Sequence, residues 1–585
     1  MNFPKLRELD TSRSMVDVFK GYNHNLRIGE GEFFDMKNMT SDHYPILAPR
    51  GKRGVYATLD APNGLIAKDN LCYVDGTDFI IGEYRIPMGL SIAAEDCPKQ
   101  LVSMGAYVII MPDKKYINTM DLNDYGDIEA TFTAHNDVYF ELCTITGDTY
   151  ENTTVSATAP ADPENLQNWI DTSTTPHTLK RYSSASEMWV SVATTYVKIS
   201  SPTLGASFKQ YDGVTISGIT VKEAKSLNGS AAVWACGDDY IVVVGILDAV
   251  TSQTLREGTI TIERKMPNMD FIIESENRLW GCRYGTAVNG DVVNEIYASK
   301  LGDFRNWNCF MGLSTDSYAA SCGTDGQFTG AITHLGYPLF FKENCVHKIY
   351  GNYPANFQIQ TTTCRGVQKG SHKSLAIVNE TLFYKSRGAV CAYDGSLPVE
   401  ASNALGNEIY SDAAAGAHGN KYYISMKDAS EQWHLFVFDA AKGMWHKEDS
   451  IRADSFCSCR GELYAIDHDT KNIITMLGSG AQGDGKVSWM AQTGPIGTDM
   501  PDMKYISRMT IRMSMDVGTR VRFLVQYDSI GDWEQLGAMT GTNLRSFSIP
   551  IRPRRCDHFR LRIDGEGDAR IYSITKTIEQ GSDIS

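Results

Sequence analysis

Two loop sequences in this chain contain residue types that could bind a phosphate or a metal ion. Gly480–Lys486 matches most of a phosphate-binding loop, in which backbone amides and a lysine hold phosphate oxygens. Val487 stands where the magnesium-binding Ser or Thr is required, so we interpret this segment as a glycine-rich linker. Asp121–Asp127 resembles the start of a calcium loop, but Phe132 occupies the position of the bidentate glutamate. A turn is therefore expected there.

Other reactive residue types show no spacing that assembles a site. The thirteen cysteines include one close pair, Cys457 and Cys459, with no second pair or histidine cluster to complete a zinc site. The twelve histidines are scattered, and no Gly-x-Ser-x-Gly nucleophile motif occurs. We therefore predict no cofactor, no metal site, no catalytic residue and no enzymatic activity. Hydrolysis of a glycan by two carboxylates stays open, because any pair among 70 acidic residues could serve.

A strand signature, a turn residue followed by Leu or Tyr and then aromatic or β-branched residues, recurs along the chain. Its seven copies contain Leu71, Tyr107, Leu279, Leu339, Leu382, Tyr422 and Leu463. The last four copies are separated by 43, 40 and 41 residues, which is the length of one four-stranded propeller blade. Aspartates that follow several copies are interpreted as turn formers. The pattern predicts an all-β protein with a propeller of about seven blades.

The spacing also divides the chain into domains. From Tyr107 to Leu279 is 172 residues, about four blade lengths, so an inserted β-rich domain is expected at 127–258, with one short helix at 163–170. The alternative is two separate propeller-like halves. The remaining domains follow from the repeats and the linker: an extended N-terminal arm at 1–54, the propeller at 55–126 and 259–480, and a β-sandwich at 487–585.

The sandwich is predicted from strict alternation of apolar and polar residues, such as Met509, Ile511 and Met513 against their polar neighbours. Residues 501–585 contain 13 Lys and Arg against 11 Asp and Glu, a net charge of +2, whereas the whole chain carries −15. Six arginines fall opposite the apolar registers and should form a basic outer face that docks another protein: Arg508, Arg512, Arg520, Arg522, Arg560 and Arg562. The alternatives are ordinary solvated arginines or, least favoured at +2, a DNA-binding face.

Several segments resemble phage tail hub and nozzle proteins. They are Asn38-Met39, Tyr44–Gly51, Gly105–Asp113, Cys364–Val367 and Pro550–His558. The resemblance implies a structural protein of the virion tail that forms a homo-oligomeric ring, often sixfold. It also implies contacts with an adaptor, tail fibres or a plug, and genomic DNA that passes through the channel without specific binding. The competing class is a glycan-binding or glycan-hydrolysing propeller, such as a receptor-binding protein.

Two further sequence features bear on where the chain is made and what it binds. The most apolar run, Tyr240–Leu247, is too short to cross a bilayer, and the first residues are charged where a signal peptide is apolar. We therefore expect synthesis in the host cytoplasm and no membrane insertion. The net charge of −15 argues against nucleic-acid binding by the chain as a whole.

Overall fold

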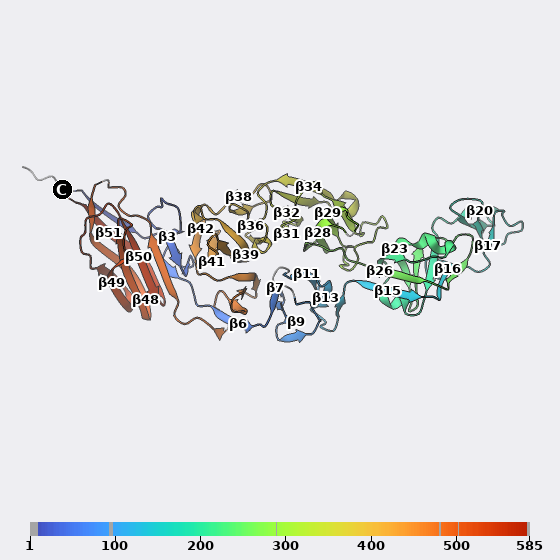
Figure 1. The fold of residues 1–585 in the computed structure, drawn as a ribbon, viewed down its shortest axis with the longest axis horizontal. Helices are drawn as coiled ribbons and strands as arrows, with labels where there is room; N and C mark the ends of the chain where they lie inside the picture. Colours follow the sequence, from blue (N-terminus) through green and yellow to red (C-terminus); the bar gives the residue numbers. More distant parts are fainter. Residues whose placement is uncertain (1–9, 93–97, 288, 479–480, 501, 582–585) are drawn as a thin grey trace, which may run out of the picture.

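The computed structural model describes residues 10–92, 98–287, 289–478, 481–500 and 502–581. Gly480 of the phosphate-loop-like segment lies outside these residues. The described chain is elongated, with a propeller between a C-terminal sandwich and an inserted β-module (Figure 1). Its helical segments are short 3-10 turns: η1 (Leu204–Ser207), η2 (Lys222–Leu227), η3 (Pro354–Asn356), η4 (His372–Ser374) and η5 (Asn403–Leu405). No helix in the described ranges is long and apolar enough to span a membrane. The predicted all-β fold class is confirmed.

The propeller consists of seven antiparallel four-stranded blades, six of which are built from consecutive strands. Blades one to three contain β7 (Pro62–Lys68), β8 (Asn70–Asp75), β9 (Asp78–Ile81) and β10 (Tyr84–Ile86); β11 (Gln100–Met104), β12 (Tyr107–Met111), β13 (Lys115–Asn118) and β14 (Tyr125–Asp127); and β27 (Phe271–Ser275), β28 (Arg278–Thr286), β29 (Val292–Ala298) and β30 (Tyr318–Ser321). Blades four and five contain β31 (Gly330–His334), β32 (Tyr337–Lys342), β33 (Cys345–Tyr350) and β34 (Gln358–Thr363); and β35 (Ala376–Val378), β36 (Thr381–Lys385), β37 (Val390–Tyr393) and β38 (Val399–Glu400).

The last two blades connect the propeller to the N-terminal arm. Blade six contains β39 (Tyr410–His418), β40 (Lys421–Asp428), β41 (Trp433–Asp439) and β42 (Met444–Lys447). Blade seven contains β43 (Ala453–Cys459), β44 (Glu462–Asp467) and β45 (Asn472–Thr475), and its fourth strand is β6 (Gly54–Thr58), which also pairs with β46 (Ala481–Gln482). The first strands of most successive blades contact each other, and β43 of blade seven contacts β7 of blade one. The arm therefore closes the circle, and the predicted seven blades are confirmed.

The seven signature copies all lie on the second strand of a blade. Leu279, Leu339, Leu382 and Leu463 are fully buried there. A second strand has a neighbour on each side and a blade against each face, so apolar residues on both faces are favoured. Separate apolar clusters fill the spaces between successive blades, as Phe341 and Leu382 do between blades four and five.

The inserted module runs from β15 to β26, which pair with each other where the module meets the propeller. Its eight-stranded sheet comprises β15 (Ala130–His135), β16 (Val138–Cys143), β21 (Tyr196–Ser200), β22 (Gly213–Ser217), β23 (Gly229–Cys236), β24 (Tyr240–Val244), β25 (Ser252–Leu255) and β26 (Thr259–Arg264). A second sheet at the far end comprises β17 (Thr154–Ser156), β18 (Asn168–Asp171), β19 (Thr178–Ser183) and β20 (Met188–Ser191). The helix predicted at 163–170 is wrong, because a turn with Leu166 at φ 68° leads directly into β18.

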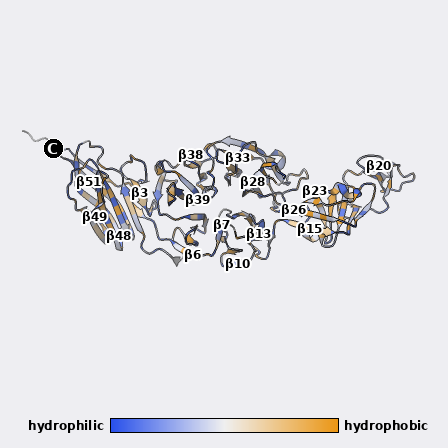
Figure 2. Ribbon diagram, viewed as in Figure 1, coloured by the Kyte–Doolittle hydropathy of each residue, from blue (hydrophilic) through white to orange (hydrophobic). Residues whose placement is uncertain are grey.

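The C-terminal module consists of β47 (Ser488–Thr493), β48 (Lys504–Tyr527), β49 (Glu534–Ile549), β50 (Phe559–Glu566) and β51 (Ala569–Gln580). Met509, Ile511 and Met513 are buried, whereas Arg508 and Arg512 are exposed, so the predicted alternation is confirmed. Figure 2 shows hydrophobic and hydrophilic residues along the same strands. One apolar cluster includes both sandwich residues and blade-six residues.

The N-terminal arm joins the sandwich to the propeller by hydrogen bonds. It contains β1 (Thr11–Val16), β2 (Gly21–Tyr22), β3 (Glu32–Lys37), β4 (Met39–Thr40) and β5 (Ala48–Pro49). Strand β2 pairs with β42 of blade six, β3 pairs with β47, and β1 pairs with β51. Blade six, the arm and the sandwich therefore form one twelve-stranded sheet.

Candidate functional site

A cavity of about 590 Å³ opens where the inner strands of blades six and seven begin. Its walls come from η4, from the start of β39, from the β40–β41 turn and from the start of β43. The charged and histidine side chains that line it are His372, Lys373, Asp412, Lys427, Glu431, Arg452 and Asp454. A second cavity of about 300 Å³, toward blade one, shares Lys373, Arg452 and Asp454 with the first. Together with Pro98, these three residues form the wall between the two cavities.

Some charged groups of this cavity are compensated within the chain. Lys427 Nζ lies 2.7 Å from Asp412 Oδ2. Asp454 lies 3.0 Å from His468 Nδ1. Asp412 has a left-handed backbone, φ 51°, at a bulge of β39, which accounts for its exposed position at the cavity edge. The carboxylates are thus held in place and still have free lone pairs to accept hydrogen bonds.

Two cations of the shared wall differ from these pairs. The Arg452 guanidinium lies 5.3 Å from the Trp433 ring centre. Lys373 is the second cation that lines this wall. Neither has a hydrogen-bond or ion-pair partner among the residues that the structure describes. Burial lowers the pKa of Lys373, and the charge of Asp454 opposes that shift. Burial, with a contribution from Lys373, also lowers the pKa of His372 to about 4.

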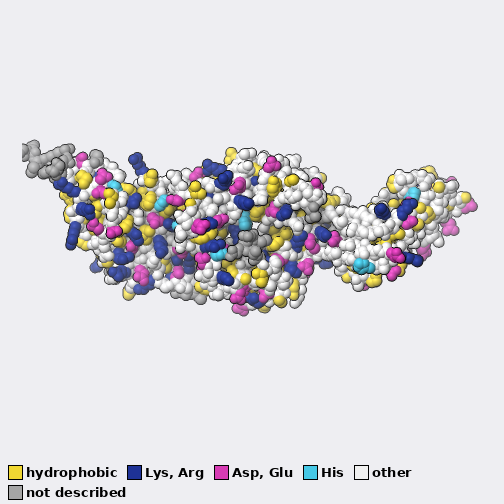
Figure 3. All heavy atoms as spheres, viewed as in Figure 1, with side chains coloured by type: hydrophobic (Ala, Val, Ile, Leu, Met, Phe, Trp, Pro, Cys, Tyr) yellow, Lys and Arg dark blue, Asp and Glu magenta, His cyan; other side chains and the backbone are white. Residues whose placement is uncertain are grey.

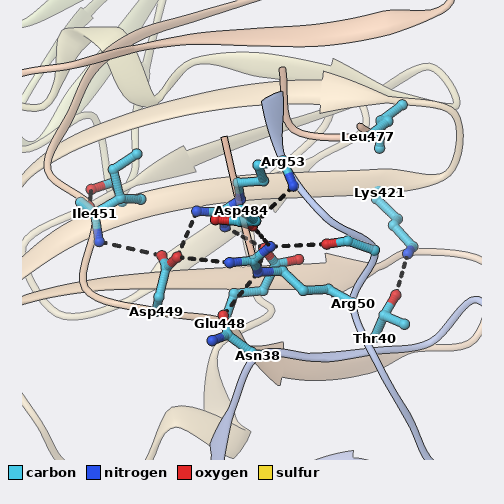
Figure 4. A network of polar contacts seen from close by, with 12 residues as sticks. Asn38, Thr40, Arg50, Arg53, Lys421, Glu448, Asp449, Ile451, Leu477 and Asp484 are labelled. Atoms are coloured by element: carbon cyan, nitrogen blue, oxygen red, sulfur yellow. Dashed lines mark hydrogen bonds and ion pairs between the residues drawn. The ribbon is translucent and has the colours of Figure 1, made fainter. Parts of the chain in front are cut away.

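A second polar cluster lies where the arm crosses blades six and seven (Figure 4). Arg53 contacts Glu448 at 2.6 Å and Asp449 at 2.5 Å, and Arg50 contacts Asp484 at 2.8 Å. Burial raises the pKa of Glu448, and Arg53 partly opposes this shift. Burial alone would also raise the pKa of Asp484, but hydrogen bonds from Arg50 and Arg53 lower it. Most of these groups are nearly inaccessible to solvent, so the cluster stabilises the junction and is not a ligand site.

The inserted module is held by a third polar cluster, which the sequence did not reveal. Arg264 Nη1 lies 2.5 Å from Asp212, and Asn306 donates from Nδ2 to Asp212 at 2.9 Å. All three residues are buried. Asn306 belongs to Gly302–Trp307, which loosely resembles the turn motif of sialidase-type propellers, so that partial match was the available signal. In this chain the segment attaches the inserted module to blade three.

The six arginines predicted to form a basic face differ in how far the structure exposes them. Arg508, Arg512, Arg520 and Arg522 are exposed along β48. Arg560 and Arg562 are only half exposed: Arg560 lies 4.9 Å from the ring centre of Phe34 in the arm, and burial lowers its pKa. Lys and Arg side chains are numerous on the visible face of the sandwich (Figure 3).

Some charges on this face are paired within the sandwich. Arg522 and Arg562 both contact Asp564, at 3.3 and 2.7 Å. Two of the six arginines predicted for the basic face are therefore already in ion pairs within the sandwich. By contrast, residues 130–264 of the inserted module carry 15 acidic against 8 basic residues, a net charge of −7. The two ends of the molecule thus differ in the sign of their net charge.

The remaining sequence motifs have structural roles. Asp394 accepts from Ser396 N at 3.0 Å and Asp467 from Asp469 N at 3.2 Å, which fits the interpretation as turn formers. Asp121 accepts from Asn123 N in the same way. The twelve cysteines in the described ranges are free. In those ranges, no group of three or more His, Cys, Asp or Glu side chains is arranged to hold a metal ion.

Comparison with known proteins gives no family for this chain. No family model matches it, and no curated protein matches it. Similar solved structures include the exo-β-1,3-galactanase of Phanerochaete chrysosporium, at 9% identity over 52% of this chain and 94% of that chain, with a TM-score of 0.22. They also include an engineered GH43 glycoside hydrolase, at 8% identity over 53% and 96%, with a TM-score of 0.20. A third is the sialidase of Trypanosoma rangeli, at 10% identity over 97% and 95%, with a TM-score of 0.22.

These matches correct the prediction that the chain has no enzymatic activity. The matched structures are glycoside hydrolases and a sialidase, so that prediction is withdrawn. TM-scores of 0.20 to 0.22 are too low to assign an activity, a substrate or a catalytic residue to this chain. The resemblance to phage tail proteins stays a prediction.

Proposed function

We propose that this chain is a structural component of a bacteriophage tail, in which the propeller holds two interaction modules apart. The observation that carries the proposal is the twelve-stranded sheet from blade six through the arm into the sandwich. Backbone pairing runs from blade six through β2 and β3 into the sandwich, so hydrogen bonds as well as the chain join the two domains. An elongated unit with different surfaces at its two ends suits a load-bearing assembly.

The charge distribution supports contacts between copies or with other tail proteins. Four exposed arginines lie on one strand of the sandwich, while the inserted module is acidic. Opposite charges steer association and fix its register more than they add affinity. The proposed assembly is a ring, sixfold as the family resemblance implies. The acidic chain would let genomic DNA pass through such a ring without binding it.

The test of this proposal is the mass of the purified protein in solution. Light scattering after gel filtration should give a multiple of the 64.8 kDa chain at 0.1 M salt. The multiple should fall as salt rises, because salt screens the charge contacts. A monomer at every concentration and salt level would contradict the ring.

A second function, glycan binding by the propeller, is favoured by the cavity beside blades six and seven. Its size is that of a small-molecule site, and its carboxylates can accept hydrogen bonds from sugar hydroxyls. We propose it as an additional role, compatible with a place in a tail that touches a cell surface. A glycan array probed with the full chain, followed by a hydrolysis assay on every bound glycan, tests binding and cleavage separately.

A further inference from the structure

Ser529, His558 and Asp557 form a hydrogen-bonded row at one end of the sandwich. Ser529 lies in the turn that follows β48, and His558 directly precedes β50. Tyr527 pairs with Phe559 in the ladder between these strands, which brings the two segments together. Ser529 Oγ lies 2.7 Å from His558 Nε2, and His558 Nδ1 lies 2.9 Å from Asp557 Oδ2. A hydroxyl, an imidazole and a carboxylate therefore stand in the order that nucleophilic catalysis by serine uses.

The partners of His558 fix the direction of both hydrogen bonds. An ionised carboxylate only accepts hydrogen bonds, so His558 donates from Nδ1 to Asp557. The Nε2 atom of the neutral ring then has a free lone pair, and the Ser529 hydroxyl donates to it. The hydrogen bond from His558, together with the charge of Lys504, lowers the pKa of Asp557 and so favours its ionised form. His558 is therefore oriented to accept the proton of the Ser529 hydroxyl.

Within the described residues, no other histidine contacts both a carboxylate and a hydroxyl. His347 has a threonine hydroxyl at each ring nitrogen. His468 contacts the carboxylate of Asp454, and His418 contacts the hydroxyl of Ser458. The arrangement around His558 is thus distinct from the other histidine contacts of the chain.

Asp528 holds the two segments of this row against each other. Its Oδ1 accepts from Asp557 N at 2.7 Å and from His558 N at 3.3 Å, and its own N–H donates to His558 O at 2.9 Å. The next residue, Ser529, is exposed and has φ 52°, a left-handed conformation that is strained in serine. A strained turn that exposes the hydroxyl is also how one class of hydrolases presents its nucleophile. The turn therefore presents Ser529 to solvent while Asp528 fixes the position of His558.

We propose that Ser529 is a nucleophile that His558 activates, and that it accepts the acyl group of carboxylic esters. In the first step Ser529 Oγ bonds to the carbonyl carbon, and its proton passes to His558 Nε2. The C–O bond to the alcohol then breaks, and the alcohol leaves with that proton. Water hydrolyses the acyl-serine by the same route, which releases the acid and restores the hydroxyl. Asp557 and Asp528 are positioning residues, and this activity is separate from the two functions proposed above.

The open position of the site favours esters of short acids. Ser529 is exposed and the neighbouring Ile530 is 78% exposed, so a long acyl chain would find few contacts. The N–H of Ser529 makes no hydrogen bond with another described residue and can donate to the oxyanion, as the serine's own amide does in serine proteases. Acylation of Ser529 is therefore the step to measure.

The experiment treats the full chain with para-nitrophenyl acetate and, separately, with a fluorophosphonate, and locates the modified serine by peptide mass spectrometry. The peptide that contains Ser529 should gain one acetyl or one phosphonyl group. Ser529→Ala should abolish this modification, and His558→Gln should slow it by at least about 100-fold, since a general base contributes that much. Ser548→Ala, at an exposed position of β49, is the matched control and should react like the parent chain.

The positioning residues are tested by the acylation rate together with the thermal transition. Asp557→Asn should slow acylation by at least about tenfold, because an amide that donates to Nδ1 leaves the proton of His558 on Nε2. Asp528→Ala should slow it by about tenfold, because the backbone of His558 is released. Asp528→Asn keeps an oxygen that accepts both N–H groups and should restore the rate of the parent chain. The thermal transition should stay unchanged in all three variants.

The same measurements can overturn the proposal. If Ser529 of the folded parent chain reacted no faster than Ser548, Ser529 would not be an activated nucleophile. Equal rates in the parent chain and in His558→Gln would overturn activation by His558. Phosphonylation of Ser529 without acetylation would overturn the assignment of esters as substrates.

Discussion

The inserted module and the C-terminal sandwich are attached to the propeller in different ways. The sandwich continues the hydrogen-bonded sheet of blade six through the arm and shares an apolar cluster with it. The inserted module has its own apolar cluster, is connected by the chain to blades two and three, and contacts blade three through the buried group of Asp212, Arg264 and Asn306. One junction is built from backbone pairing and apolar packing, and the other from a few polar side chains.

The difference leads to different expectations for motion and unfolding. A shared core couples two domains into one cooperative unit, whereas a small polar interface leaves each domain to unfold by itself. We therefore expect the sandwich, arm and propeller to unfold together and the inserted module to unfold separately. The predictions below test this contrast, from the largest expected effect to the smallest.

The strongest test removes one large side chain from each core. Trp445 on β42 is buried opposite Tyr22 of the arm and donates its indole N–H to Ala401 O at 2.8 Å. Trp445→Ala should lower the free energy of unfolding by about 3–5 kcal/mol. The loss should appear in propeller and sandwich alike, measured by hydrogen exchange of peptides from both.

The matched change in the inserted module is Phe140→Ala, at a fully buried position of its own cluster. Its cost should be of similar size and confined to peptides within 130–264. If both variants lost protection from exchange equally throughout the chain, the whole chain would unfold as one cooperative unit. The expected separate unfolding of the inserted module would then be wrong.

The polar junction can be broken by Asp212→Ala, which leaves the buried Arg264 without its carboxylate. Removing one partner of a buried ion pair typically costs about 3–5 kcal/mol, but here the cost should be limited by water entering a small interface. We expect the inserted module to stay folded and to move relative to blade three. Faster proteolysis near 128–130 and 264–266, with an unchanged main thermal transition, is the expected result. Ser217→Ala, a change on an exposed position of the same module, should leave proteolysis unchanged.

Acid should weaken the propeller through two buried histidines. Burial lowers the pKa of His347 to about 4, with Lys342 adding to the effect, and burial likewise lowers the pKa of His446 to about 3. A histidine with a depressed folded pKa stabilises the fold fully above its unfolded pKa of about 6.5, and this contribution is lost as pH falls from 6.5 toward 4 or 3. At pH 5 each residue should cost about 2 kcal/mol.

His446 tests whether the propeller and the sandwich unfold together, because it lies on β42 where the arm pairs with blade six. Denaturant unfolding at pH 7 and pH 5 should show the propeller and sandwich weakening in parallel. In His446→Gln the loss between these pH values should shrink by about 2 kcal/mol. A sandwich whose stability does not change with pH while the propeller weakens would contradict a shared unit.

The propeller could be predicted from the sequence because one signal repeats seven times. Each copy marks a second strand, where burial on both faces leaves little freedom of residue type, as at Leu339 and Leu382. The alternation in β48 was equally informative, because one face of that strand is buried on either side of the exposed residues 516–518. The helix expected at 163–170 failed because the capping signal of Asp162 and Pro163 also suits a turn, and local propensity did not decide between them.

The site residues were harder to predict, because their meaning depends on contacts between distant segments. Lys373 precedes the first strand of blade five, Arg452 and Asp454 lie at the start of blade seven, and none of the three belongs to a local motif. Asn38 and Arg50 were noticed as part of a family resemblance, and the structure brings them together at 2.8 Å in the arm junction. Alternation correctly placed Arg508 and Arg512 outward, but the arm residue Phe34 that covers Arg560 could not be inferred from strand periodicity.

Replacing the exposed arginines of β48 is expected to have the smallest effect on stability. The same replacement tests whether the basic sandwich makes contacts between molecules that the acidic inserted module does not make. Replacing Arg508, Arg512, Arg520 and Arg522 with Ser should change the free energy of unfolding by less than about 1 kcal/mol per residue, since exposed charges contribute little. Assembly should respond much more, because the proposed contacts use these charges between molecules.

Light scattering at 0.1 M salt should show the oligomer of the parent chain reduced toward the monomer in this variant. The matched control replaces four exposed cations of the inserted module with Ser: Lys209, Lys222, Lys225 and Arg256. It changes the net charge equally, so a general charge effect would dissociate both variants alike. Dissociation of the β48 variant alone would assign the contact to the sandwich. Unchanged assembly of a folded β48 variant would instead leave these arginines as ordinary solvated residues, and the basic face would lose its proposed role.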